Sequence, residues 1–311
     1  MPKSAFVALI GRPSVGKSTL VNLLCGEKVA IVSDTPQTTR NAVRGILTCT
    51  EGQLVFIDTP GRHISEKKLN KKLMEVADRA LAETEIILYV LDAGRCPGPE
   101  EIAVAEKLKG YGERIVAVIN KTDVKGANPK EIREFLVEFL PDLPPSLCFE
   151  ISCLKKEGIK PLLDCLFKMA PDGEPLYPGD YYTDQDMVFR ISEIIREKAI
   201  NRLKDELPHS IYVDVADLEF RGGSPGVSDP HSEEIPAGKK RLWIRAFIIT
   251  ERESQKGIVV GKGGEMIKAI GQAARKELNS IFDFKVDLDL RVKTGKDWRQ
   301  KDHVIRKITG F

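Results

Sequence analysis

The stretch Gly11-Arg-Pro-Ser-Val-Gly-Lys-Ser18 decides the fold of this chain. It separates two glycines by four residues and follows the second with Lys and Ser, which is the phosphate-loop pattern. A strand-like run, Ala5–Ile10, precedes it, and a helical pattern, Lys17–Leu24, follows. The glycines let backbone N–H groups turn toward phosphates, and the helix N-terminus adds partial positive charge. The stretch therefore predicts a nucleoside triphosphate site.

Strand-like and helix-like runs alternate on both sides of this loop. The predicted strands are Ala5–Ile10, Leu54–Ile57, Ile86–Leu91, Ile115–Ile119 and Leu147–Ile151. The predicted helices are Lys17–Leu24, Leu69–Ala82, Glu100–Lys109, Lys130–Leu140 and Ile159–Met169. This alternation predicts an α/β domain with a mostly parallel sheet and helices on both faces. Ligands of such sheets bind at the carboxyl ends of the strands, where the motifs below lie.

Asp58-Thr59-Pro60-Gly61 ends one of these strands. A carboxylate fixed there can hold the magnesium shell, and the Gly61 N–H can contact the γ-phosphate. The polar segment Pro36–Arg40 lies between the two motifs, and Thr39 is predicted to close onto Mg²⁺ when the γ-phosphate is present. A simple surface loop is the alternative. We expect the Mg²⁺ ligands to be Ser18, Thr39 and Asp58, and the catalytic residues to be Lys17, Thr39 and Gly61.

Asn120-Lys-Thr-Asp123 follows the strand Ile115–Ile119 and selects the base. A carboxylate accepts two hydrogen bonds from the N1–H and exocyclic amino group of guanine, an edge that adenine lacks. Ser152-Cys153-Leu154 would offer a backbone amide to the guanine carbonyl. These motifs predict GTP as substrate and GDP as product. The expected nucleotide-binding residues are Gly11, Arg12, Pro13, Ser14, Val15, Gly16, Lys17, Ser18, Thr19, Asp58, Thr59, Pro60, Gly61, Asn120, Lys121, Thr122, Asp123, Ser152, Cys153 and Leu154.

A Pro/Gly-rich segment from Ala170 to Asp186 interrupts the periodic pattern and predicts a domain boundary. We expect a first domain over residues 1–170, a linker over 171–186, and a second domain over 187–311 with a basic C-terminal tail. The second domain reads as helix, two strands, a short turn or helix, a longer helix and a final strand. A polar loop, Arg221–Gly238, separates its first two strands and has no assigned role.

Gly261-Lys-Gly-Gly264 lies between the apolar run Gly257–Val260 and a helix that begins at Glu265. Glycines there would let a phosphodiester approach the backbone, with lysines supplying charge and Ile258 an apolar floor for bases. A helix N-cap turn with solvated lysines is the alternative. The RNA-binding residues that we expect are Lys256, Ile258, Gly261, Lys262, Gly263, Gly264 and Lys268.

Composition limits the remaining possibilities. Of the 311 residues, 42% are apolar, and no run approaches the roughly 20 residues of a membrane span. The first four residues lead directly into a strand, so we expect no signal peptide. The six cysteines form no Cys-x-x-Cys pair, which favours reduced thiols in a cytoplasmic protein. Seven basic residues against two acidic ones in Arg291–Lys307 indicate an anionic partner or a solvated tail.

The motifs, in order, resemble the translation-factor-like branch of P-loop GTPases, and nearly the whole chain resembles the Era family of bacteria. The resemblance is carried by Gln37-Thr-Thr-Arg40, Asp58–Gly61, Leu176-Tyr-Pro with Thr183-Asp184, and the carboxyl half. It implies Mg²⁺-dependent GTP hydrolysis and a type II KH domain, whose Gly-x-x-Gly loop clamps four nucleotides of single-stranded RNA. It also implies the 3′ end of 16S rRNA and the 30S ribosomal subunit as partners, a monomer, and a cytoplasmic location with peripheral inner-membrane association left open.

Two positions depart from the family pattern. Ser14 stands where the family usually has an Asn that is associated with potassium-stimulated hydrolysis, so the resemblance leaves potassium dependence open. Arg62 follows Gly61 where the family usually has an apolar residue, and no glutamine is available there to orient the attacking water. Catalysis would then rest on positioning and electrostatics. Arg62 and His63 are either participants or exposed spectators.

Three other functions compete with this interpretation. A metabolic kinase or ATPase fits the phosphate loop, but Asn120–Asp123 argues against it. An interaction protein that binds GTP without turnover is the second. The third keeps the GTPase switch but gives its carboxyl domain another RNA, a protein or a membrane as partner.

Overall fold

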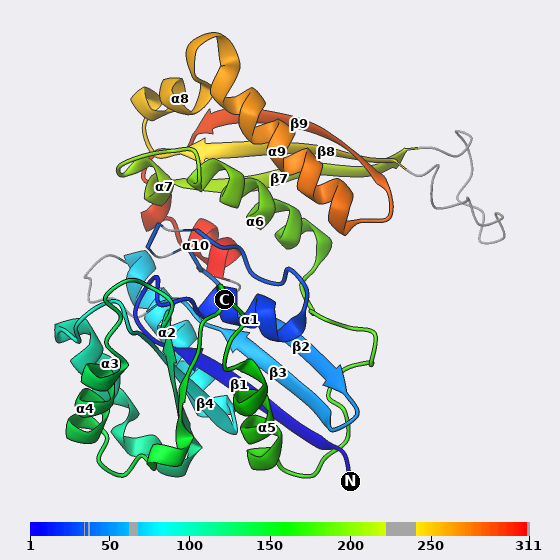
Figure 1. Cartoon of the computed structure of the whole chain (residues 1–311). Helices are drawn as coiled ribbons and strands as arrows, with labels where there is room; N and C mark the ends of the chain where they lie inside the picture. Colours follow the sequence, from blue (N-terminus) through cyan, green and yellow to red (C-terminus); the bar gives the residue numbers. More distant parts are fainter. Residues whose placement is uncertain (34, 37, 62–67, 222–240, 310–311) are drawn as a thin grey trace, which may run out of the picture. The chain divides into compact units, whose positions relative to one another are not determined.

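The computed structural model describes residues 1–33, 35–36, 38–61, 68–221 and 241–309. The chain forms two compact units. The first comprises Met1–Asp184 together with the C-terminal segment from Asp302, and the second comprises Gln185–Lys301. Each unit has its own sheet and helices, as Figure 1 shows.

The first unit contains a six-stranded sheet in the order β2-β3-β1-β4-β5-β6. All neighbours in it are parallel except β2 and β3, which pair antiparallel. The parallel strands end at one edge, so the segments that follow β1, β3, β4, β5 and β6 meet there. The bounds are β1 Lys3–Ile10, β2 Val43–Cys49, β3 Gly52–Asp58, β4 Ile86–Asp92, β5 Ile115–Asn120 and β6 Cys148–Glu150.

Helices cover both faces of this sheet (Figure 1). Apolar side chains of α2, α3 and α4 share one core with β1, β4 and β5, whereas α1 and α5 lie over the other face. Strands β3 and β4 are buried along their whole length, as expected for strands covered on both sides. The bounds are α1 Lys17–Cys25, α2 Lys68–Glu83, α3 Pro99–Leu108, α4 Pro129–Phe139 and α5 Ile159–Met169, with short 3₁₀ turns at η1 Lys109–Arg114 and η2 Pro145–Leu147.

The second unit packs helices α6 and α9 over a three-stranded sheet in the order β7-β8-β9. Strand β8 pairs antiparallel with β7 and parallel with β9. Apolar residues of both helices and all three strands form its core. The bounds are α6 Met187–Ile200, α7 Leu207–Ser210, β7 Ile211–Arg221, β8 Arg241–Thr250, α8 Glu253–Val260, η4 Lys262–Gly264, α9 Glu265–Ile281, β9 Lys285–Thr294 and η5 Trp298–Gln300.

The predicted fold class is confirmed, and the structure adds elements that the sequence patterns do not predict, among them one strand and one C-terminal helix. Strand β2 extends the first sheet on its β3 side, and residues Asp302–Thr309 form a helix, α10. Helix α10 contacts α2 within the first unit, with Val304 and Ile305 buried. The loop Arg221–Gly238 lies outside the described residues after Arg221.

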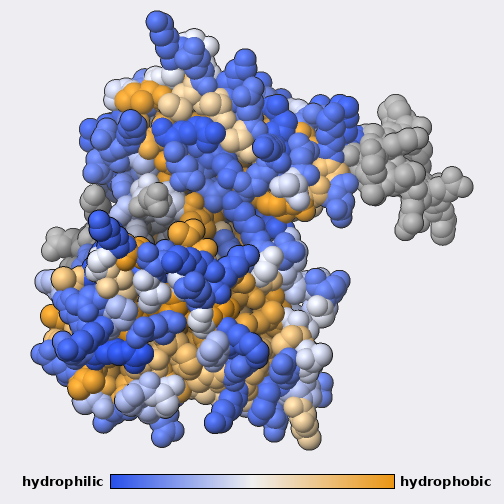
Figure 2. Space-filling view, viewed as in Figure 1, coloured by the Kyte–Doolittle hydropathy of each residue, from blue (hydrophilic) through white to orange (hydrophobic). Residues whose placement is uncertain are grey.

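Hydrophilic residues cover most of the face drawn in Figure 2, with apolar residues between them. Across the described residues, no helix is both long and apolar enough to cross a bilayer. The six cysteines, which the sequence predicts as thiols, are all free.

Candidate nucleotide site and RNA-binding loop

The phosphate loop (Gly11–Ser18) joins β1 to α1 and needs glycine at both ends. A Cβ at Gly11 would lie 2.3 Å from the carbonyl oxygen of Val90 on β4. Gly16 has a φ of 102°, and a Cβ there would lie 2.4 Å from Nδ2 of Asn120. The first contact fixes the start of the loop against β4, and the second brings its end against the segment predicted to read the base.

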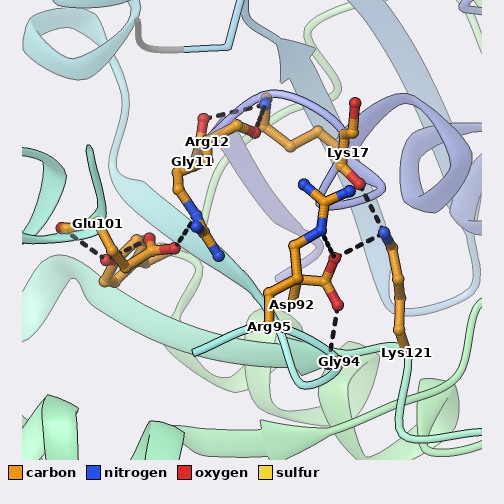
Figure 3. Close-up of polar contacts among 10 residues, drawn as sticks. Gly11, Arg12, Lys17, Asp92, Gly94, Arg95, Glu101 and Lys121 are labelled. Atoms are coloured by element: carbon orange, nitrogen blue, oxygen red, sulfur yellow. Dashed lines mark hydrogen bonds and ion pairs between the residues drawn. The ribbon is translucent and has the colours of Figure 1, made fainter. Parts of the chain in front are cut away.

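Lys17 is buried beneath this loop. Its Nζ donates to the carbonyl oxygens of Gly11, at 3.1 Å, and Arg12, at 2.9 Å (Figure 3). Burial lowers the pKa of Lys17 to about 8, although the nearby carboxylates of Asp58 and Glu101 act in the opposite direction. A polyphosphate beside the ammonium would favour its charged form further.

Ser18, Thr39 and Asp58 meet at the carboxyl end of β3. The Ser18 hydroxyl donates to Asp58 Oδ2 at 2.6 Å and lies 3.0 Å from the Thr39 hydroxyl, which in turn lies 3.3 Å from the same carboxylate oxygen. Asp58 is fully buried, and its Oδ1 has no hydrogen-bond partner among the described residues. Burial raises the pKa of Asp58. Two hydroxyl groups beside a buried carboxylate, one oxygen of which has no hydrogen-bond partner among the described residues, fit the preference of Mg²⁺ for oxygen ligands.

Gly61 follows this cluster and lies against the phosphate loop, where a Cβ would be 2.8 Å from the backbone N of Pro13. The structure thus brings the three residues expected to be catalytic to one place: Lys17, Thr39 and Gly61 all line the same pocket. Arg62 and His63, whose roles the sequence left open, lie outside the described residues, as does Gln37. Ser14 has a φ of 64°, and its Oγ is buried without a hydrogen-bond partner in the described chain.

The segment that follows β5 is tied to the phosphate loop. Asn120 Nδ2 donates to the carbonyl of Val15 at 2.9 Å, and Asn120 Oδ1 accepts from the backbone N–H of Cys153. Lys121 Nζ donates to the carbonyl of Ser14 at 2.7 Å. The side chains of this motif therefore link the segments that follow β1, β5 and β6 at one edge of the sheet.

Asp123 and Ser152 form the far end of the same site. The Ser152 hydroxyl donates to Asp123 Oδ1 at 2.5 Å, and this hydrogen bond holds the pKa of Asp123 below its ordinary value. The Ser152 oxygen also accepts from the N–H of Lys155, at 3.0 Å. An ionised, oriented carboxylate is what recognition of the guanine edge requires. Leu154 is 83% exposed beside it.

Two residues near the site were not anticipated from the sequence. Asp92, the last residue of β4, is 3% exposed and accepts from Lys121 Nζ at 2.7 Å and from the Gly94 N–H at 2.9 Å (Figure 3). Arg95 follows on the loop and lines the same pocket as Lys17 and Lys121. The position of Asp92 in the sequence could have indicated it, because it ends a buried strand at the edge of the sheet where the motifs lie.

The Gly261–Gly264 loop lies between α8 and α9, as predicted. Gly261, Gly263 and Gly264 have φ values of 77°, 60° and 82°, a region that favours glycine. Lys262 and Lys268 are exposed, and Ile258 on α8 is 56% exposed. Lys256 pairs with Glu253 at 3.1 Å. The loop thus offers backbone without Cβ atoms at three of its four positions, together with positive charge, while one of the four candidate side chains is engaged in an ion pair.

Comparison with known proteins assigns both units. Residues 6–121 match a family described as 50S ribosome-binding GTPase, and residues 232–299 match the KH domain family. The chain is 48% identical to GTPase Era of Treponema denticola over 98% of its own length and 99% of that protein. It is 44% identical to GTPase Era of Borreliella burgdorferi at the same coverage. The chain belongs to the Era GTPase family. It is accordingly a GTP-binding protein that hydrolyses GTP to GDP and phosphate.

Solved structures of Era resemble the whole chain. A variant of Aquifex aeolicus Era bound to GDP·AlF₄⁻ matches with a TM-score of 0.86 and 35% identity, over 98% of both chains. Era in complex with MgGDPNP and nucleotides 1506–1542 of 16S ribosomal RNA matches with a TM-score of 0.87 and 34% identity, again over 98% of both chains. These structures support the two-part architecture of this Era-family chain, a P-loop GTPase domain and a KH domain.

Proposed function

We propose that the chain is a GTP-dependent switch whose KH domain binds the 3′ end of 16S rRNA and which assists assembly of the 30S ribosomal subunit. The observation that carries the switch is the cluster of Ser18, Thr39 and Asp58. It joins α1, the polar segment after it and β3 through one carboxylate oxygen. A segment held at a shared metal site by the γ-phosphate can be released when that phosphate leaves.

In this proposal the phosphate loop and Lys17 hold the phosphates, while Asn120–Asp123 and Ser152–Leu154 hold the base. Ser18, Thr39 and Asp58 would hold Mg²⁺, which supplies charge neutralisation between the β- and γ-phosphates when bound. The Mg²⁺-bound relative supports this assignment. Thr39 and the Gly61 N–H contribute positioning at the γ-phosphate, and Lys17 contributes positive charge.

RNA is the proposed partner of the second unit. The exposed Gly-x-x-Gly loop with its flanking lysines supports it, as does the rRNA-bound Era structure, which covers this chain almost completely. Lys256, Lys262 and Lys268 would contact phosphates, Ile258 would contact bases, and Gly261, Gly263 and Gly264 would admit the RNA backbone. We place this activity in the cytoplasm, in a monomer. Peripheral association with the inner membrane is the further possibility that the family resemblance raises.

The guanine assignment is tested by nucleotide competition. Asp123→Asn should lose most of its affinity for GDP, and ATP should not compete with GTP in the unchanged protein. Phosphate release should disappear in Lys17→Ala. Equal affinity for ATP and GTP would contradict the assignment, and turnover by Lys17→Ala would contradict the proposed role of the phosphate loop.

The RNA assignment is tested by fluorescence anisotropy with an oligonucleotide of the 16S rRNA 3′ end and a scrambled control. A variant carrying Lys262→Asp and Gly263→Asp should lose affinity by at least about tenfold. The control is Lys276→Asp, which makes the same Lys-to-Asp change on α9, away from the loop. It should bind the RNA nearly as tightly as the unchanged protein does. The affinity of the unchanged protein for the 16S rRNA oligonucleotide should differ between its GDPNP-bound and GDP-bound forms. An equal loss of RNA affinity in both variants would overturn the assignment. Tighter binding of the second unit to a protein partner or to lipid vesicles than to RNA would overturn it as well.

A further inference from the structure

A buried group of charged and polar side chains lies behind the phosphate loop, outside the recognised motifs. Arg12, the second residue of the loop, forms an ion pair through Nε with Oε2 of Glu101 on α3, and Figure 3 shows the guanidinium pointing toward that carboxylate. Tyr89 on β4 donates its hydroxyl to Glu101 Oε1 at 2.7 Å. Glu101 is 1% exposed and Tyr89 is fully buried.

The carboxylate is held where a buried charge can be kept. Glu101 stands in the first turn of α3, where the helix N-terminus favours an anion. Burial raises its pKa, while the Tyr89 hydrogen bond and the Arg12 charge oppose that shift. An isolated buried carboxylate would be costly, so the arrangement is stable only with Arg12 in place.

The ion pair also fixes the position of Lys17. The Arg12 side chain is anchored to α3, and the Arg12 carbonyl oxygen accepts the hydrogen bond from Lys17 Nζ at 2.9 Å. The neighbouring Gly11 is pressed against the Val90 carbonyl. The first two residues of the loop are thus held from outside, by β4 and by α3, and both direct carbonyls at the lysine.

From this geometry we infer that Glu101 is a positioning residue for phosphate binding, acting through Arg12 on the backbone of the phosphate loop and on Lys17. Arg12 accordingly serves the site from behind, with its side chain turned to α3, and only its backbone faces the nucleotide. Tyr89 orients the carboxylate. The inference rests on the proposed role of Gly11–Thr19 in holding the phosphates.

A positioning role makes a specific kinetic prediction. The loop binds the phosphates in the ground state and in the transition state alike, so its displacement should raise KM and the dissociation constant of GDP with little change in kcat. We expect Glu101→Gln to raise both constants by about tenfold or more, with kcat within about threefold. Tyr89→Phe should cause a smaller change in the same direction. Glu106→Gln, an exposed carboxylate on the same helix, is the control and should change neither.

A double variant distinguishes the proposed positioning role of Glu101 from a role in protein stability alone. Arg12→Met with Glu101→Met removes both charges, so its melting temperature should recover relative to Glu101→Gln. Because the anchor is still missing, its KM should stay raised. Wild-type KM in the double variant, wild-type GDP affinity in Glu101→Gln, or a loss confined to kcat would each overturn the inference. Lys17→Ala distinguishes the underlying proposal: if it keeps GDP affinity, the phosphate-loop assignment itself fails.

Discussion

Gly61 lies so close to Pro13 that a Cβ on the glycine would be 2.8 Å from both the Cα and the N of the proline. The segment that follows β3 therefore packs directly on the backbone of the phosphate loop. Such a contact transmits displacement in either direction, because neither backbone can yield without moving its own loop.

Gly61→Ala should separate these two segments. Relieving an overlap of this size costs about 1–3 kcal/mol, so we expect kcat for GTP to fall about tenfold while GDP affinity changes much less. Single-turnover hydrolysis and GDP titration measure the two effects. Gly110→Ala is the control, because a Cβ at Gly110 meets no atom within 4 Å. Unchanged hydrolysis by Gly61→Ala would show that the contact does not matter for turnover.

Lys17 should make nucleotide binding depend on pH. Its pKa of about 8 means that the ammonium is progressively lost above that value, and a bound diphosphate needs the charged form. GDP affinity, measured without metal, should fall as the pH rises from about 8 to about 10. Lys17→Arg should bind more weakly but lose less affinity over this range, because the guanidinium does not titrate there.

The same lysine should affect the stability of the protein, measured without nucleotide, with the opposite sign. Its folded pKa of about 8 lies below the ordinary value of 10.5, so the unfolded chain binds more protons between these two values. The free energy of unfolding attributable to Lys17 therefore rises as the pH increases through that window. Denaturant titrations at several pH values should show the rise in the unchanged protein and not in Lys17→Met.

Asp92 should matter for the base through Lys121. The pair is short, at 2.7 Å, and the carboxylate is nearly buried, so Asp92→Asn removes a charge-assisted hydrogen bond to Lys121, the side chain that we propose lies along the base. We expect about a tenfold loss of GDP affinity. Arg95 lies 3.8 Å from the same carboxylate and is 62% exposed, so Arg95→Ala should cost less than about twofold. Equal losses would indicate that Arg95 itself contacts the nucleotide.

The sequence revealed those parts of the site in which contiguous residues carry the chemistry. Three such motifs lie at or directly after the ends of predicted strands, and the parallel sheet brings them to one edge: Gly11–Ser18, Asp58–Gly61 and Asn120–Asp123. The place of Thr39 in a polar segment and the family resemblance predict a role at the metal site, and the Thr39 hydroxyl lies 3.0 Å from that of Ser18 and 3.3 Å from Asp58 Oδ2.

Contacts between distant segments could not be predicted in this way. The Arg12–Glu101 pair joins residues on the phosphate loop and α3, and nothing in either local pattern requires the other. The sequence pattern does not predict strand β2, which follows a polar loop and pairs antiparallel with β3 at the edge of the sheet, where pairing with a neighbour influences strand formation as much as local propensity. The charged residues of Asp302–Thr309 predict a basic tail, whereas the segment forms helix α10, which contacts α2 and buries Val304 and Ile305.

Alanine substitutions at Gly261 and Gly263 can separate backbone strain from steric overlap in the Gly261–Gly264 loop. At Gly261 an alanine faces both a φ of 77° and a Cβ placed 2.7 Å from Met266 Cβ, so conformational strain and steric overlap add. At Gly263 the φ is 60° but the space is open, so strain of about 1–2 kcal/mol acts alone. Gly261→Ala should therefore lower the free energy of unfolding more than Gly263→Ala does, and should displace the start of α9.

If the loop binds RNA, Gly263→Ala should still weaken binding, because the added methyl group lies on the exposed surface that the RNA backbone would approach. Denaturant titration and RNA anisotropy on the same preparations distinguish the two effects. The expectation fails if the order of stabilities is reversed, or if Gly263→Ala binds RNA as tightly as the unchanged protein.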